Sequence, residues 1–266
     1  MKIGFIGTGN MNSALIKGYS QEALNVGNEL FAYNRTHVKA QRLAQEVSLK
    51  ICDSIKSLVE ETEIIVLGIE PQNYNEVMPL IASSYTKDKI FVSIAAGITI
   101  DYIEKHLGEE AKVVRVMPNT PAMVGLGASA LCRNSNVTDD EFDTVRKIFI
   151  SVGVAEEVDE EMIHAVIGVS GSAPAYTYMY IDALTEVGIR NGLDYDTAKL
   201  FAAQGVIGAA RLVIESEESP DVLCDRVCSP GGTTIEAVTA LKENKFQDKV
   251  IEGAERAIMR SKEITK

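Results

Sequence analysis

The chain has little positive charge, and this shortage restricts its partners. Its 266 residues include 26 lysines and arginines against 38 aspartates and glutamates, a formal net charge of −12 at pH 7. A nucleic-acid-binding protein needs a basic face that neutralises phosphates. No cluster of basic residues interrupts the acidic background, so we expect no nucleic-acid partner.

Long apolar runs are also missing. No unbroken apolar stretch is long enough to cross a bilayer, and the first residues lack the pattern of a signal peptide. Lys2–Ile6 instead has the pattern of a short buried strand. These absences favour a cytoplasmic protein with no membrane partner.

Cysteine and histidine are scarce. The three histidines are scattered, and the four cysteines follow neither a disulfide framework nor a zinc pattern: Cys52, Cys132, Cys224 and Cys228. Small packing residues are the better interpretation, because free Cys is usually buried. With no metal ligands predicted, we expect an organic cofactor to supply any difficult chemistry.

The first half of the chain alternates short apolar runs with helical or turn segments. This alternation is typical of βαβ units, in which helices cover both faces of a mainly parallel sheet. Thr138-Asp139-Asp140-Glu141 has the pattern of a helix N-terminus. Strands are expected at Lys2–Ile6, Glu29–Tyr33, Glu63–Ile69, Lys89–Ile94 and Lys112–Met117, with edge strands at Gly127–Cys132 and Ala155–Val158.

After about Val158 the pattern becomes helical only. A long helix is expected to begin near Pro174 and to end at Asn191-Gly192, and Asp194–Ile214 predicts a second that is rich in Ala and Gly. Small residues let another helix pack closely, within the chain or across a dimer. The predicted fold is α/β, with a doubly wound Rossmann domain at residues 1–158 and an all-helical domain at residues 159–266.

A glycine turn follows the first strand directly. Gly7-Thr8-Gly9-Asn10-Met11 leads into an amphipathic run, the order in which backbone N–H groups and a helix N-terminus hold a pyrophosphate. A lone G-x-G is a weak signal, but its place after the first strand strengthens it. Asn12 occupies the third small position of this fingerprint, and its bulk predicts looser packing of the helix on the strand.

The second strand ends at Asn34-Arg35-Thr36, where the ribose of a dinucleotide is expected. A chain specific for NAD usually has Asp or Glu there to accept hydrogen bonds from the ribose hydroxyls. An amide, a cation and a hydroxyl suit a 2′-phosphate instead, although Arg35 could also be a solvated surface residue. NADPH is the predicted cofactor, with NADH as the alternative.

The most informative segment is Ser229-Pro230-Gly231-Gly232-Thr233-Thr234, which precedes an apolar-periodic run. Pro fits the first turn of a helix, Ser and Thr cap it, and Gly lets a ligand approach backbone N–H groups. A plain helix cap needs one such residue. The cluster therefore favours a site for a small anion.

In order along the chain, these motifs resemble those of the pyrroline-5-carboxylate reductases. The resemblance covers essentially the full chain and includes Ser93-Ile94-Ala95-Ala96-Gly97, Met117-Pro118-Asn119-Thr120-Pro121 and Ser170-Gly171-Ser172-Ala173-Pro174-Ala175-Tyr176. It implies a C-terminal helical domain that interleaves with its mate in a homodimer, often assembled further, commonly into a decamer. The implied enzyme reduces the cyclic imine Δ1-pyrroline-5-carboxylate to L-proline with NAD(P)H, the last step of proline biosynthesis.

The resemblance also implies a set of site residues. Thr234 is catalytic, with its hydroxyl directed at the ring nitrogen, and Glu160 lies near the substrate ring unless it is only a solvated acid. The implied substrate-binding residues are Ser229, Gly231, Gly232, Thr233, Thr234, Glu160 and Asn119. The implied cofactor-binding residues are Gly7, Thr8, Gly9, Asn10, Met11, Asn34, Arg35, Thr36, Ile69, Glu70, Pro71, Ala95, Ala96 and Asn119.

Two residues depart from the family pattern, and two rival functions remain. Glu70 replaces a usual Lys and could repel the cofactor phosphates, and Ile55 replaces a common Asn.

A 3-hydroxyacid dehydrogenase-like oxidoreductase would rely on a lysine in the first long helix, and Ser170–Arg190 contains none. A non-enzymatic NADP-sensing regulator would not need the Ser229–Thr234 pocket.

Overall fold

The computed structural model describes residues 1–21 and 27–265. The chain divides into two compact units, of which unit 1 comprises Met1–Gly171 with Ala257–Lys266 and unit 2 comprises Ser172–Arg256. The boundary expected after residue 158, where the sequence pattern becomes helical only, stays a prediction.

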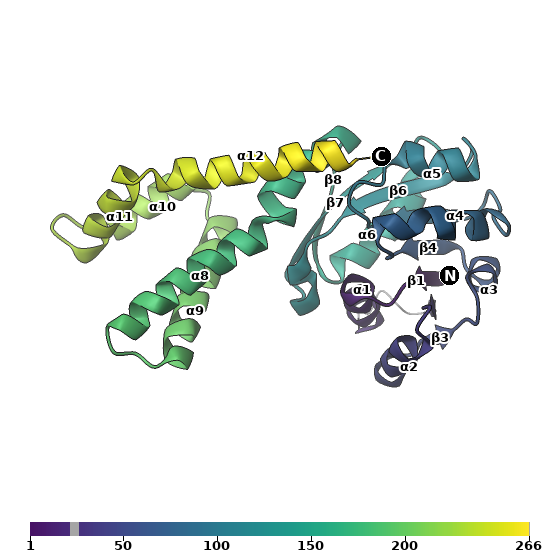
Figure 1. Ribbon diagram of the computed structural model, residues 1–266, viewed down its shortest axis with the longest axis horizontal. Coiled ribbons are helices and arrows are strands. Elements are labelled where there is room, and N and C mark those ends of the chain that lie inside the picture. Colours follow the sequence, from purple (N-terminus) through teal and green to yellow (C-terminus); the bar gives the residue numbers. More distant parts are fainter. Residues whose placement is uncertain (22–26, 266) are drawn as a thin grey trace. The chain divides into compact units, whose positions relative to one another are not determined.

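Unit 1 is built on one eight-stranded sheet with the order β3-β2-β1-β4-β5-β6-β7-β8 (Figure 1). Neighbouring strands are parallel except for the antiparallel pair β6 and β7. This is the predicted doubly wound, mainly parallel fold. The strands are β1 Lys2–Ile6, β2 Glu29–Tyr33, β3 Lys50–Ile51, β4 Ile64–Leu67, β5 Ile90–Ser93, β6 Lys112–Met117, β7 Gly127–Arg133 and β8 Gly153–Glu157.

Every strand predicted from the sequence is present, with its ends shifted by at most one or two residues. β3, which pairs with β2 through Lys50 and Ile51, was not predicted. Two residues are too few to show an alternating pattern, so β3 leaves no periodic signal.

Helices bury both faces of the sheet. Successive strand residues point to opposite faces, so in β1 Phe5 packs toward α1 and α6 whereas Ile6 packs toward α3, α4 and α5. The helices of unit 1 are α1 Asn10–Gln21, α2 His37–Glu46, α3 Ile55–Glu61, α4 Tyr74–Ala82, α5 Ile100–Leu107, α6 Asp139–Ile150 and α7 Ile163–Val166. Short turns are η2 Pro71–Asn73, η3 Thr120–Val124, η4 Glu160–Met162 and the π-helical η5 Ile167–Gly171.

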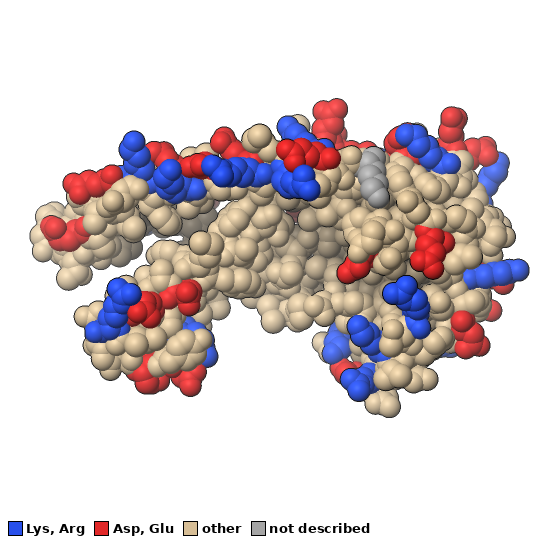
Figure 2. All heavy atoms as spheres, in the orientation of Figure 1, with Lys and Arg blue, Asp and Glu red and all other residues tan. Residues whose placement is uncertain are grey.

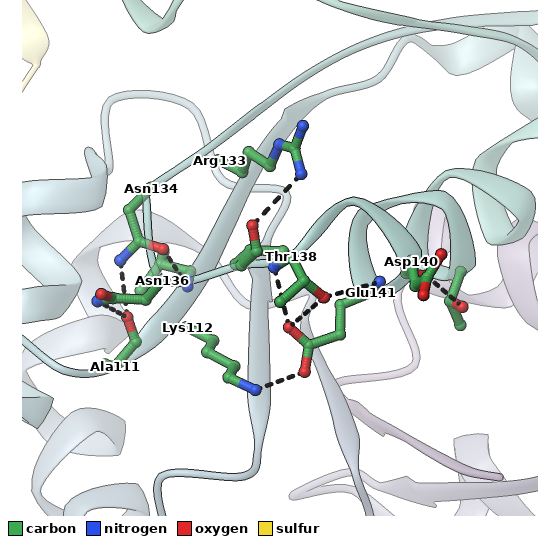
Figure 3. Close-up of polar contacts among 11 residues, drawn as sticks. Ala111, Lys112, Arg133, Asn134, Asn136, Thr138, Asp140 and Glu141 are labelled. Atoms are coloured by element: carbon green, nitrogen blue, oxygen red, sulfur yellow. Dashed lines mark hydrogen bonds and ion pairs between the residues drawn. The ribbon is translucent and has the colours of Figure 1, made fainter.

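The connection from β7 to α6 is fixed by polar side chains (Figure 3). Thr138 and Glu141 form a capping box, in which the Thr138 N–H donates to Glu141 Oε2 at 3.0 Å and the Glu141 N–H to Thr138 Oγ1 at 3.4 Å. Asn134 and Asn136 both donate to the Ala111 carbonyl, at 2.7 and 3.0 Å. The helix start predicted from Thr138 is therefore confirmed.

Unit 2 is helical throughout. Figure 1 shows α8 and α9 side by side as an antiparallel pair, joined by a turn in which Gly192 has φ +95°. Asp194 caps α9 by accepting the Thr197 N–H at 3.0 Å. The helices are α8 Ala173–Arg190, α9 Tyr195–Glu215, α10 Pro220–Val227, α11 Thr233–Glu243 and α12 Phe246–Ile264, the last of which continues into unit 1.

Large apolar side chains of α8 and α9 stay exposed, among them Met179, Phe201 and Ile214. In the described part of the chain, α9 is the one helix that is long and apolar enough to cross a membrane. Length and composition alone therefore do not exclude a membrane partner. Figure 2 shows, by contrast, side chains of both charge signs along α12, where Glu252 pairs with Lys249 and Arg256.

Candidate functional site

A cavity of ≈ 320 Å³ lies at the carboxyl ends of β1, β2 and β4. The strand order reverses between β1 and β4, because the chain fills the β2–β3 side of β1 before it crosses to β4. Doubly wound sheets bind ligands at such a switch point. The lining residues are Ile6, Gly7, Gly9, Tyr33, Asn34, Arg35, Thr36, Lys39, Ile55, Gly68, Ile69, Glu70, Asn73, Glu76, Val77 and Leu80.

The two glycines of the first turn serve different needs. Gly7 has φ +90°, and a Cβ there would lie 2.5 Å from the Gly68 carbonyl oxygen. Gly9 has no neighbouring atom within 4 Å of such a Cβ. The packing of the strand ends therefore requires Gly7, whereas Gly9 leaves open space beside the first turn of α1, where backbone N–H groups favour an anion.

Asn34 and Thr8 link the ends of β1 and β2. The Thr8 N–H donates to Asn34 Oδ1 at 3.0 Å, and Asn34 Nδ2 donates to the Thr36 carbonyl at 2.9 Å. The Thr8 hydroxyl is buried without a hydrogen-bond partner among the described residues. Asn34 thus orients the turn that joins β1 to α1.

Two exposed cations line the cavity beside the start of α2. Arg35 was predicted, and Lys39 in the first turn of α2 was missed. Neither side chain forms an ion pair within residues 1–21 and 27–265. A second cation close after Arg35 in the sequence was a usable signal for a phosphate site.

The rest of the lining includes acidic and apolar side chains. Glu70 and Glu76 both contribute to it, and Glu70 Oε2 accepts a hydrogen bond from Gln72 Nε2 at 2.6 Å. Ile55, the first residue of α3, is buried and also lines the cavity. Both departures from the family pattern therefore lie at this cavity.

The expectation that Asn12 loosens the packing of α1 is wrong. Asn12 is buried, and its Nδ2 donates to the carbonyls of Ile6 and Gly7 at 3.3 and 2.7 Å. A Cβ on Gly68 would lie only 2.2 Å from Asn12 Nδ2. The amide therefore fills the space between α1 and the ends of β1 and β4, and it fixes the turn by hydrogen bonds.

Several predicted cofactor residues lie outside the cavity lining: Thr8, Asn10, Met11, Pro71, Ala95, Ala96 and Asn119. Ala95 and Ala96 follow β5 at the same edge of the sheet. Asn119 follows β6, and its amide is engaged, because Oδ1 accepts the Ala128 N–H at 2.8 Å and Nδ2 donates to Ser170 Oγ at 3.1 Å. Its roles toward cofactor and substrate stay predictions.

Glu160 is held by structural contacts. Its Oε1 accepts from Arg115 Nη1 and from the Ile100 N–H, both at 2.9 Å. The Arg115 side chain is 3% exposed, and that of Glu160 is 32% exposed. A buried guanidinium without its carboxylate would be strongly destabilising. Glu160 is therefore more than a solvated acid, and only Oε2 is left to meet a ligand.

The structure corrects the predicted capping of the Ser229–Thr234 segment. α11 begins at Thr233 with Gly232 as its N-cap and no side-chain cap, and Pro230 lies in the preceding turn. That turn is closed by the Gly232 N–H, which donates to the Ser229 carbonyl at 3.0 Å, and Gly231 adopts φ +69°. The first-turn N–H groups have no carbonyl within their own helix, and the hydroxyls are not used to cap them.

The switch-point cavity and the Ser229–Thr234 segment therefore both offer backbone amides and hydroxyls that can bind an anion. Within the described residues, no group of three or more His, Cys, Asp or Glu is placed to hold a metal ion. The site chemistry available is positioning, charge balance and proton donation from hydroxyl groups.

Comparisons with known proteins agree with this geometry. Residues 160–264 match the family described as pyrroline-5-carboxylate reductase dimerisation, and residues 2–97 match the family described as NADP oxidoreductase coenzyme F420-dependent. The chain is 39% identical to pyrroline-5-carboxylate reductase of Escherichia coli, over 100% of this chain and 98% of that protein.

Solved structures show the same likeness. A pyrroline-5-carboxylate reductase from Coxiella burnetii superposes with a TM-score of 0.91 at 32% identity, covering 99% of this chain and 98% of the other. The Plasmodium falciparum pyrroline carboxylate reductase, with NADP bound, gives a TM-score of 0.88 at 32% identity over 100% and 98% of the two chains.

Proposed function

The chain belongs to the pyrroline-5-carboxylate reductase family, and we propose that it reduces Δ1-pyrroline-5-carboxylate to L-proline with NADPH. The observation that carries the choice of substrate is the uncapped start of α11, where amides and hydroxyls gather without a cation. A small cyclic anion with one ring nitrogen matches these donors.

The residues of the switch-point cavity fit a dinucleotide. Gly9 leaves room at the start of α1, and Arg35 and Lys39 lie between the end of β2 and the first turn of α2. In the proposal, the α1 N-terminus holds the pyrophosphate and the two cations hold the 2′-phosphate. When bound, NADPH supplies the hydride that the imine carbon C5 accepts.

The chain's own residues orient the imine and balance its charge. Backbone N–H groups from Gly231 to Thr234 take the carboxylate, and the Thr234 hydroxyl hydrogen-bonds the ring nitrogen. Because the pyrroline nitrogen can arrive protonated, this arrangement needs no strong general acid. Glu160 and Asn119 complete the proposed substrate set, and Ala95 and Ala96 the proposed nicotinamide side.

A turnover assay tests the proposal directly. NADPH fluorescence should decay when Δ1-pyrroline-5-carboxylate is added, and NADP⁺ should not be reduced by 3-hydroxyacids. Oxidation of 3-hydroxyacids in place of imine reduction would favour the rival dehydrogenase. NADPH binding with no turnover of either substrate would favour a sensor.

Replacing Arg35 by Ala should raise KM for NADPH about ten-fold or more, because the 2′-phosphate loses one charge-assisted hydrogen bond. KM for NADH should stay nearly unchanged. Only NADPH carries the 2′-phosphate, so comparing KM for NADPH with KM for NADH separates the loss of this contact from a general loss of cofactor binding. Arg42→Ala is the matched control, because Arg42 is exposed on α2 but lies outside the cavity lining. Equal losses with both coenzymes would contradict the assignment.

We further propose a cytoplasmic homodimer, assembled into a larger oligomer such as a decamer, in which residues 1–158 bind the cofactor and 159–266 bind substrate and the second subunit. The match of residues 160–264 to a dimerisation family supports this division. The exposed apolar residues of α8 and α9 support a protein partner, since exposed patches of this kind mark interfaces. The proposed partner of α9 is a second copy of this chain and not a lipid bilayer.

Ala209→Phe should release smaller species. Ala209 lines an apolar hollow of ≈ 660 Å³ on unit 2 with Tyr180, Phe201 and Gly205, and a bulky ring there would overpack a subunit contact. Light scattering measures the change. Ala82→Phe is the control, because Ala82 is exposed at the end of α4, outside this hollow and outside residues 159–266. An unchanged assembly in Ala209→Phe would place the interface elsewhere.

A further inference from the structure

Two cysteines lie at the end of α10, directly before the Ser229–Thr234 segment. Cys224 is in the last turn of α10, and Cys228 is the residue that ends the helix. Both are half-buried, whereas Cys52 and Cys132 are buried in unit 1. The two cysteines are four residues apart at the end of α10, so their side chains project from the same side of the helix.

We propose that Cys224 and Cys228 form a reversible disulfide by exchange with a low-molecular-weight disulfide such as oxidised glutathione, and that this bond weakens substrate binding at the Ser229–Thr234 segment. One protein thiol loses its proton and attacks a sulfur of the small disulfide, whose other half leaves as a thiolate. The second protein thiol, also deprotonated, then attacks the mixed disulfide and expels the remaining half. The protein loses two electrons and the small disulfide gains them.

The surroundings of Cys224 admit such a reagent. Cys224 lines a hollow of ≈ 500 Å³ on unit 2 together with Lys242, Lys245 and Asp248. The two lysines form no ion pair with any described residue. A glutathione molecule carries net negative charge, so two free ammonium groups against one carboxylate attract it toward the thiols.

Cys228 attacks in the second step of the exchange, because Cys224 is the thiol that lines the hollow. Burial, followed by the neighbouring Cys224 thiol, raises the pKa of Cys228, and Asp225 adds to this while Lys242 opposes it. Because the thiolate is the attacking form, exchange should accelerate as the pH rises toward this pKa.

Closing the disulfide should move the segment. Cβ atoms four residues apart on a helix are separated by about 5–6 Å, whereas a disulfide needs roughly 3.8 Å. Cys228 must therefore shift toward Cys224. Ser229 is bonded to Cys228, and its carbonyl accepts the Gly232 N–H, so the turn that presents the amides shifts with it.

Peptide mapping tests whether the bond forms. The full-length protein is equilibrated with oxidised glutathione, remaining thiols are alkylated, and the chain is cut with trypsin without reduction. Trypsin cleaves after Arg226, between the two cysteines, so the disulfide joins two peptides that otherwise separate. The joined pair is the expected result. Glutathione retained on a single cysteine, or no modification, would overturn the proposal.

Kinetics tests the consequence, which rests on the proposed function. Oxidation should raise KM for Δ1-pyrroline-5-carboxylate about ten-fold, the effect of weakening one hydrogen bond to a charged group, and dithiothreitol should reverse it. NADPH affinity should not change. Cys224→Ser should turn over normally and resist oxidation, while Cys52→Ser should respond like wild type. An unchanged KM in protein shown to carry the disulfide would overturn the proposed link between the disulfide and substrate binding.

If the reduced protein does not use the imine at all, the proposed function fails, and the peptide mapping still decides whether the disulfide forms.

Discussion

Thr234→Ala should lower kcat/KM for Δ1-pyrroline-5-carboxylate by about ten- to hundred-fold, because it removes one hydrogen bond to the reacting nitrogen. Thr234 is half-buried in the first turn of α11, where no side chain caps the helix. Its hydroxyl forms no hydrogen bond with any residue that the structure describes. Steady-state kinetics measures the loss, and NADPH fluorescence titration should show unchanged cofactor binding.

Two companion variants define what the Thr234 hydroxyl does. Thr234→Ser keeps the donor and should recover most of the rate. Ser229→Ala should leave the melting temperature unchanged, because Gly232 and not Ser229 is the N-cap of α11. Wild-type turnover by Thr234→Ala would show that the ring nitrogen obtains its hydrogen bond elsewhere.

Gly7→Ala should reduce the free energy of unfolding by about 2–4 kcal/mol and prevent tight NADPH binding. Gly7 has φ +90°, which L side chains rarely adopt, and its Cβ would meet the Gly68 carbonyl oxygen at 2.5 Å. Backbone on both sides has to move, because β1 and β4 are paired up to this turn. Chemical denaturation and cofactor titration measure the two effects.

Gly9→Ala is the matched control for Gly7→Ala. A Cβ at Gly9 has no neighbour within 4 Å, so the melting temperature should be preserved. The same Cβ enters the space beside the α1 N-terminus, and the Kd for NADPH should rise about ten-fold or more, which corresponds to about 1.4 kcal/mol. If Gly9→Ala binds NADPH like wild type, the pyrophosphate does not lie at this turn.

The sequence by itself determined the elements whose signals are local. Thr138 and Glu141 are three residues apart, and they form the expected capping box. Asn191-Gly192 ends α8, and the glycine turn follows β1 as expected. The family resemblance extended these local signals to the whole chain, and the comparisons confirmed it.

The tertiary structure decided which side chains line the same cavity. Lys39 and Glu76 come from different helices, and only the folding of the sheet brings both to the cavity. The start of α11 was also decided there, since a proline and several hydroxyls close together are compatible with more than one helix start. The N-cap of α11 is Gly232, so no side chain caps the first-turn amides of the helix.

Long-range polar pairs were beyond the reach of sequence patterns. Arg115 and Glu160 are 45 residues apart, and Asn119 and Ser170 are 51 apart. Periodicity and caps report hydrogen bonding and burial within a few residues, so they carry no information on such pairs. A buried guanidinium acquires its partner only when the β6 strand and the η4 turn pack together. The family resemblance implied that Glu160 lies near the substrate ring, and only the structure showed that Arg115 holds its carboxylate.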